Sequence, residues 1–90
     1  GAGREWFGEG VKLPHGTELR MTYNKRLHTG RIEDGQWEVE GASYSSPSAA
    51  AGGVARTKKG EQTNLDGWKY WEAKFPGEAK WKALNTLRRG

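Results

Sequence analysis

The shortage of aliphatic side chains is the sequence feature that most constrains the fold. Leu, Ile, Val and Phe together supply only 12 of the 90 residues, a proportion that is typical of disordered chains. The chain nevertheless has five Trp and three Tyr, and each such ring buries roughly 150–250 Å² when it enters a core. We therefore expect one small folded domain whose aromatic residues either form the core or are displayed for a ligand.

The composition excludes several classes of protein. The chain has no Cys, so disulfides, thiolate zinc sites and cysteine nucleophiles are impossible. No apolar run approaches the roughly 18 residues of a membrane span, so we expect a soluble protein without a membrane partner. The two histidines, His15 and His28, fall on a predicted turn and an exposed strand edge, where we expect them to be solvated. The sequence thus predicts no catalytic residues, no metal and no cofactor.

Charge is unevenly distributed along the chain. Residues 1–45 carry six Lys or Arg against seven Asp or Glu, whereas residues 46–90 carry nine against four. The basic groups of the second half alternate with aromatic residues, and this mixture is typical of surfaces that neutralise phosphates and stack on bases. A solvated basic face is the alternative interpretation.

The first half of the chain has the pattern of a small sheet. Residues 1–10 are predicted to be a flexible tail or a remnant of a longer chain, and residues 11–90 a single domain. Polar and apolar residues then alternate with the period of a half-buried strand, and Asp34-Gly35 supplies a tight turn. Three antiparallel strands are expected at Thr17–Tyr23, Leu27–Glu33 and Gln36–Glu40, with Gly41–Tyr44 extending the last or adding a fourth.

The strongest local signal predicts a helix from Ser46 to about Thr57. Ser46 is suited to cap the free N–H groups, Pro47 fits the first helical position, and three Ala residues follow shortly after it. The Gly52-Gly53 pair weakens this helix and indicates that its backbone packs closely on a flat surface.

The C-terminal third is predicted to form a hairpin and a short helix. Residues 58–64 have the composition of a polar loop, and Trp68–Phe75 is aromatic enough to predict a strand. The stretch from Lys80 to Arg89 fits either a strand or a helix, and we favour a strand through Lys82 and a helix from Leu84. The predicted fold class is therefore α+β, with a small antiparallel meander of short strands packed on one central helix.

The candidate ligand contacts follow from these placements. A helix start offers free N–H groups and hydroxyls to a phosphate, basic loop residues neutralise phosphates, and rings beside them pack near a base. The candidates from the residues alone are Ser46, Ser48, Arg56, Lys58, Lys59, Trp68, Lys69, Tyr70 and Trp71.

Three segments together resemble the RAMA (restriction enzyme adenine methylase associated) domain. They are Gly41-x-x-Tyr44-x-Ser46-Pro47-Ser48-Ala49-Ala50-Ala51, then Gly67-Trp68-x-x-Trp71, then Leu84-x-x-Leu87-Arg88. The upstream pattern Leu13-Pro14-x-Gly16-Thr17-x-Leu19 is also similar to the N-terminal strands of that family. The resemblance covers roughly residues 11–89.

This resemblance implies a noncatalytic DNA-binding module of a restriction-modification or related DNA-processing protein. Its expected partners are double-stranded DNA, with recognition of N6-methyladenine proposed for the family, and other domains of a longer parent chain. The expected location is intracellular. The family usually has Asn-Gly-Trp where this chain has Asp66-Gly67-Trp68, which puts any amide contact to adenine in doubt. Asn64, two residues earlier, is the candidate replacement.

A protein-interaction module is the rival expectation, because aromatic residues and Arg also anchor protein interfaces. Such a module would dock through the Trp-rich face. The exposure of Trp68, Tyr70 and Trp71 distinguishes a core role from a surface role.

Overall fold

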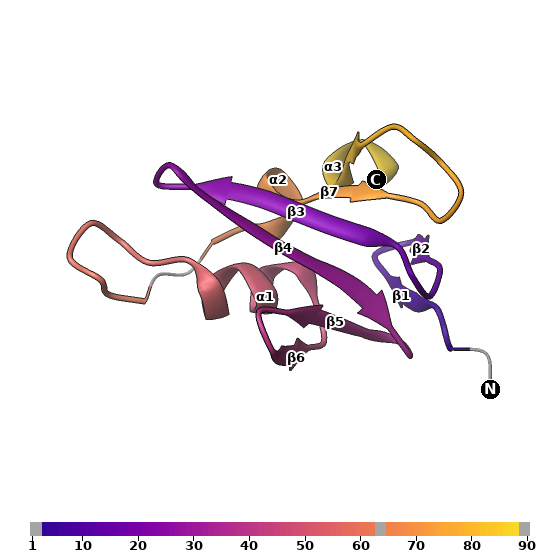
Figure 1. The fold of residues 1–90 in the computed structure, drawn as a ribbon, viewed down its shortest axis with the longest axis horizontal. Helices are drawn as coiled ribbons and strands as arrows, with labels where there is room; N and C mark the ends of the chain where they lie inside the picture. The colour runs from indigo at the N-terminus through magenta and orange to yellow at the C-terminus, as the bar shows by residue number, and fades with distance from the viewer. Residues whose placement is uncertain (1–2, 63–64, 89–90) are drawn as a thin grey trace.

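Two-residue turns connect four consecutive strands of an antiparallel sheet. The computed structural model describes residues 3–62 and 65–88 (Figure 1). The four strands are β3 (Glu18–Tyr23), β4 (Arg26–Glu33), β5 (Gln36–Val39) and β6 (Ala42–Tyr44). Both residues of each turn have positive φ, as at Asn24 (53°) and Lys25 (65°), which is the signature of hairpin turns that match the strand twist. The predicted meander is confirmed, and it includes the optional fourth strand.

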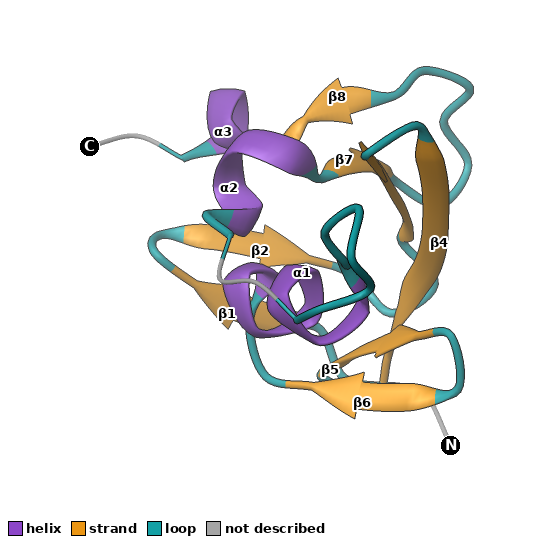
Figure 2. Cartoon of the chain, turned by 90° about the vertical axis from the view of Figure 1, so that its left-hand side faces the viewer, coloured by secondary structure: helices purple, strands orange, loops and turns teal. Residues whose placement is uncertain are grey.

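The C-terminal hairpin extends this sheet on its other side. β7 (Glu72–Lys74) pairs with β3, and β8 (Lys82–Ala83) pairs with β7, so that the sheet order is β6-β5-β4-β3-β7-β8. The short helix α3 (Leu84–Leu87) follows directly and begins at the predicted residue. The predicted α+β class is therefore confirmed, with the helices lying inside the curve of the sheet (Figure 2).

The central helix α1 (Pro47–Val54) begins as predicted and ends earlier than predicted. The Ser46 hydroxyl accepts a hydrogen bond from the Ala49 N–H at 3.1 Å, and Pro47 occupies the first turn. The predicted continuation to Thr57 is wrong, because the side chains of Gln62 and Arg56 donate to the carbonyls of Gly52 and Gly53 at the helix end. Among the described residues, no helix is long and apolar enough to cross a membrane.

Four tryptophans form the centre of the core. The rings of Trp6, Trp37, Trp68 and Trp71 are each at most 7% exposed. Trp37 packs edge-to-face against Trp6 at 5.6 Å and against Trp71 at 5.3 Å between ring centroids. The indole N–H of Trp71 donates to the Pro47 carbonyl at 2.9 Å, so this cluster is tied to the start of α1. The expectation that Trp37 lies in the sheet core is confirmed.

The predicted strand at Trp68–Phe75 is wrong in its first half. Residues 67–70 form the single-turn helix α2 (Gly67–Tyr70), and the Asp66 carboxylate caps it by accepting from the Trp68 N–H at 3.1 Å. A helical turn places Trp68 and Trp71 on one side, where both are buried, whereas a strand would direct them to opposite faces. Gly67 lies so close to the Pro47 carbonyl that a Cβ there would overlap it.

The predicted tail is also wrong for residues 6–10. The strand β1 (Trp6–Gly8) pairs with β2 (Val11–Leu13) in a separate two-stranded sheet. Trp6 is buried and its indole N–H donates to the Ser45 carbonyl at 2.8 Å. One large ring thus anchors a segment that otherwise has little periodicity. Residues 1 and 2 lie outside the described residues.

We predict that Glu9→Asn stabilises the protein. Glu9 has φ of 51° in the β1–β2 turn, a conformation that costs most residues about 1 kcal/mol and that Asn tolerates. The free energy of unfolding measured with urea is expected to rise by about 0.5–1 kcal/mol. Glu5→Asn is the control, since Glu5 is exposed without positive φ, and an equal gain in both variants would contradict the explanation.

Candidate functional site

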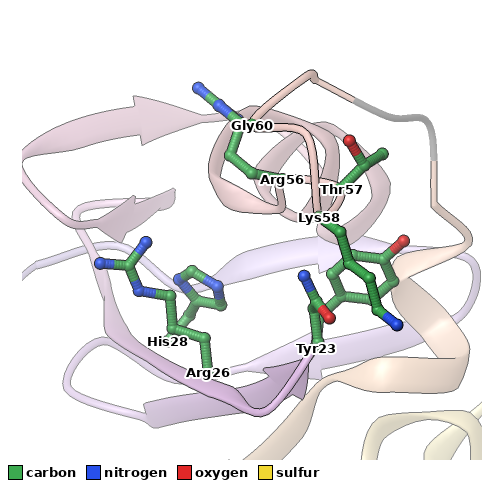
Figure 3. Close-up of a pocket in the computed structure, with 8 residues that line it drawn as sticks. Tyr23, Arg26, His28, Arg56, Thr57, Lys58 and Gly60 are labelled. Carbon is green, nitrogen blue, oxygen red and sulfur yellow. The ribbon is translucent and has the colours of Figure 1, made fainter.

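A cleft of about 220 Å³ lies between the tip of the β3–β4 hairpin and the loop that follows α1 (Figure 3). We call it the basic cleft. The hairpin contributes Tyr23, Asn24, Arg26 and His28, and the loop contributes Arg56, Thr57, Lys58 and Gly60.

The hairpin directs its side chains into the cleft by strand alternation. Arg26 lies opposite Tyr23 across the two-residue turn, and His28 is two residues further along β4 on the same face. Leu27, between them, points away and is 60% exposed. The turn at Asn24 and Lys25 therefore places an aromatic ring, an amide and a guanidinium around one opening.

The loop on the other side is ordered by its own backbone. The Thr57 N–H donates to the Glu61 carbonyl, and the Gly60 N–H donates to the Thr57 carbonyl, both at 2.9 Å. The Thr57 hydroxyl also accepts from the N–H groups of Lys59 and Glu61, at 3.3 and 3.2 Å. This turn leaves Lys58 and Lys59 exposed at its tip.

The Arg and Lys side chains of the basic cleft have no carboxylate partners among the described residues. Within the described ranges, neither Arg26, Arg56 nor Lys58 forms an ion pair. The outer face of the sheet differs, because two of its cations are paired with carboxylates on neighbouring strands. These pairs are Arg20 with Glu72 at 2.8 Å and Lys74 with Glu18 at 2.9 Å. The cleft is therefore where unpaired positive charge gathers on two elements at once.

His28 forms part of the wall of the cleft in a fixed orientation. The expectation of a solvated histidine on an exposed edge is wrong, because the side chain is only 4% exposed. Its Nδ1 lies 2.7 Å from a carboxylate oxygen of Glu40, which sits at positive φ in the β5–β6 turn. The carboxylate fixes the plane of the imidazole ring and favours a proton on Nδ1.

An aromatic pair extends from the cleft toward α2. Tyr70 packs edge-to-face against Tyr23 at 5.7 Å between ring centroids, with an interplanar angle of 78°. Tyr70 is 37% exposed, and its neighbour Lys69 is also exposed. Of the three rings predicted near a base, Tyr70 alone is exposed.

The structure removes Trp68 and Trp71 from the candidate surface. Both rings are buried in the tryptophan cluster and are not accessible for stacking on a base. The hydroxyls at the start of α1 already have structural partners, because Ser46 accepts from Ala49 and Ser48 accepts from the Gly67 N–H at 3.2 Å. The predicted phosphate position there thus competes with helix capping and with the docking of α2.

The remaining predicted residues divide between the cleft and its surroundings. Arg56 and Lys58 line the cleft, and Lys59 lies beside Lys58 on the same loop. Asn64 lies outside the described residues. The contribution of the hairpin was not predicted from the sequence, although an aromatic residue, an amide and two cations in succession were a signal for it. These residues are Tyr23, Asn24, Lys25 and Arg26.

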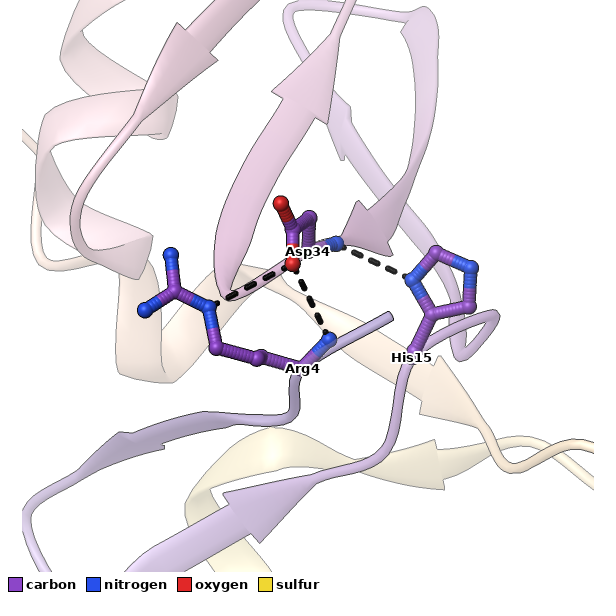
Figure 4. A network of polar contacts seen from close by, with 3 residues as sticks. All are labelled: Arg4, His15 and Asp34. Carbon is purple, nitrogen blue, oxygen red and sulfur yellow. Dashed lines mark hydrogen bonds and ion pairs between the residues drawn. The ribbon is translucent and has the colours of Figure 1, made fainter. Parts of the chain in front are cut away.

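A second, more open hollow lies beside the N-terminal strand. Its volume is about 630 Å³, and its wall includes Pro14 and the exposed ring of Phe7. At its edge the Asp34 carboxylate accepts from the backbone N–H of Arg4 at 3.2 Å and from its guanidinium at 3.4 Å (Figure 4). His15, on the predicted turn, accepts from the Asp34 N–H through Nδ1 at 3.0 Å. This network attaches the N-terminal segment to the β4–β5 turn.

No family model, curated protein or solved structure matches this chain at a significant level.

We predict that Thr57→Val loosens the loop that carries Lys58 and Lys59. Valine keeps the shape of the side chain and removes the oxygen that accepts two backbone hydrogen bonds. The amides of Lys59 and Glu61 should then exchange with solvent several-fold faster, corresponding to about 1 kcal/mol. Hydrogen exchange measured by NMR tests this, and unchanged protection of both amides would contradict it.

We also predict that the Arg4 contact is sensitive to acid. Hydrogen bonds from the Arg4 backbone and side chain hold the pKa of Asp34 below its ordinary value of 3.8. Because the pKa of Asp34 is lower in the folded protein than in the unfolded chain, the ionised carboxylate stabilises the fold at neutral pH. This contribution is lost as the pH falls through the folded-state pKa.

Arg4→Gln should therefore lower the urea midpoint at neutral pH, and the midpoints of the two proteins should converge as the pH drops below 3.8. Added salt should also narrow the difference. A difference that stays constant over this pH range would show that Arg4 stabilises the protein by other means.

Proposed function

We propose that this chain is a noncatalytic module that binds double-stranded DNA inside the cell. The observation that carries this proposal is the basic cleft, which is lined by Arg26 on the hairpin and by Arg56 and Lys58 on the loop, without carboxylate partners among the described residues. Arg56 also donates to the carbonyls of Gly53 and Ala55. Cations held in this way attract phosphates and release the counterions that surround DNA. Exposed Lys25, Lys59 and Lys69 extend the positive surface.

The sequence pattern supports a narrower form of the same proposal. On its resemblance to the RAMA domain, the chain would serve a restriction-modification or related DNA-processing protein, with other domains of a longer parent chain as neighbours. The start of α1 and the Gly-Trp-x-x-Trp segment, which carry the resemblance, are in contact through the Trp71 indole and the Pro47 carbonyl. Those motif residues support the fold, and the cationic residues of the cleft supply the proposed contacts to the phosphates.

The rival proposal is that a protein docks on a Trp-rich face, and this proposal requires exposed Trp rings. Four of the five tryptophans are buried, and Trp81 is half-buried with the Arg20 guanidinium 4.1 Å from its ring centroid. No specific observation on the described residues favours this function over DNA binding.

We predict that reversing the charge at Lys58 and Lys59 abolishes most DNA binding. The double variant Lys58→Glu/Lys59→Glu should weaken binding to a matched duplex by at least about ten-fold and reduce the slope of log affinity against log salt by about two. Fluorescence anisotropy at about 50 and 200 mM NaCl measures both quantities.

The matched control is Lys12→Glu/Lys80→Glu, which changes the net charge equally at exposed positions outside the cleft. It should retain affinity within about three-fold, because long-range steering alone is weak at these salt concentrations. Equal losses in the two double variants would show that net charge rather than the cleft governs binding. Undetectable, salt-independent binding by the unmodified protein would overturn the proposal.

A further inference from the structure

The volume of the basic cleft is smaller than that of pockets that enclose drug-sized ligands, and it suits a group of the size of one base. Pockets that enclose drug-sized molecules have volumes of about 300–1,000 Å³, whereas the cleft measures about 220 Å³. It is bounded on one side by a hairpin tip and on the other by a loop closed by its own hydrogen bonds. A ligand that fits must therefore be compact, anionic at the rim and able to enter between two chain segments.

Part of the cleft wall is aromatic, and this further restricts the kind of group that the cleft can bind. Tyr23 lines the cleft and is supported from behind by its edge-to-face contact with Tyr70. In duplex DNA the bases present only their edges in the grooves, so the face of a base reaches an aromatic side chain only after it leaves the stack. Phosphates of a regular duplex can reach the cationic rim, but its bases cannot reach this wall.

The same hairpin wall also offers polar groups held in place. Arg26 is the cross-strand neighbour of Tyr23, and His28 lines the cleft two residues further along β4 (Figure 3). Glu40 holds Nδ1 of His28, and within residues 3–62 and 65–88 no hydrogen bond is made by Nε2. A buried ring with one nitrogen fixed by a carboxylate offers the other to a ligand at a defined position. Asn24, with an amide that both donates and accepts, follows Tyr23 in the hairpin turn and also lines the cleft.

We infer that the basic cleft receives a single unpaired nucleotide of the bound DNA. The base packs against the ring of Tyr23, its edge faces His28 and Asn24, and Arg26, Arg56 and Lys58 contact its flanking phosphates. The protein therefore prefers DNA that contains an unstacked nucleotide over a fully paired duplex, since the cost of extracting the base is then already met. This inference rests on the proposed DNA binding and specifies which DNA is bound.

The test compares two labelled duplexes that differ only by one unpaired nucleotide in the middle of one strand. Fluorescence anisotropy is measured at about 50 and 200 mM NaCl with the full chain. Because stacking of one base on an aromatic side chain is worth a factor of about five or more, the bulged duplex should bind at least about five-fold tighter than the matched one.

Two substitutions at the aromatic wall show whether Tyr23 causes this preference. Tyr23→Leu keeps apolar bulk and removes the ring, so the preference should disappear while affinity for the matched duplex stays within about two-fold. Tyr23→Phe keeps the ring and should keep the preference. Phe7→Leu is the control, because Phe7 is an aromatic residue that is 64% exposed on β1, outside the cleft. Circular dichroism checks that each variant is folded.

The outcomes separate the inference from the function on which it rests. Equal, salt-dependent binding of both duplexes would overturn the inference and leave DNA binding standing. A preference for the bulge that survives in folded Tyr23→Leu would also overturn it. Failure to bind either duplex at low salt would overturn the proposed function and this inference together.

Discussion

The packing of four tryptophan rings against the start of α1 is the interaction on which the rest of the structure depends. Trp71 joins β7 to the helix by donating to the Pro47 carbonyl, and Trp6 joins the N-terminal strand by donating to the Ser45 carbonyl. Each ring therefore buries apolar area and also fixes the direction of one segment. Trp37 lies between them and touches both. A chain with so few aliphatic residues obtains its core volume and part of its topology from the same side chains.

The sheet was predictable because its signals are local. Alternation and two-residue turns depend only on neighbouring residues, and both indicated the meander correctly. The segment Trp68–Phe75 was misread because its aromatic content was given more weight than its spacing. Trp68 and Trp71 are three residues apart, which places both on one side of a helical turn, and Asp66 provides the cap. The role of Trp6 could not be predicted locally, since its partner Ser45 is 39 residues away.

The loop side of the candidate site could be predicted from local sequence signals, whereas the hairpin side could not. Basic residues after a helix indicate an exposed loop, and Arg56 and Lys58 were identified in this way. The wall that faces this loop is formed by the β3–β4 hairpin. It exists because the hairpin extends past the core, and no local sequence pattern reveals how far it extends. At that end the inward-facing Arg26 and His28 line a cleft beside the loop that follows α1. Polar residues on the inward face near a hairpin tip thus indicate a cleft only once the tertiary structure is known.

The position of β3 in the middle of the sheet has a consequence for the order of folding. One of its edges pairs with β4 through a two-residue turn, whereas its other edge pairs with β7, and the Arg20–Glu72 contact across that edge spans 52 residues of sequence. Closing the long loop costs more entropy than closing the short one and slows the pairing. We therefore expect the meander to assemble first, with the edge of β3 that faces β7 left unpaired until β7 is in place. During that interval the exposed edge is the part of the chain most prone to pair with a second molecule.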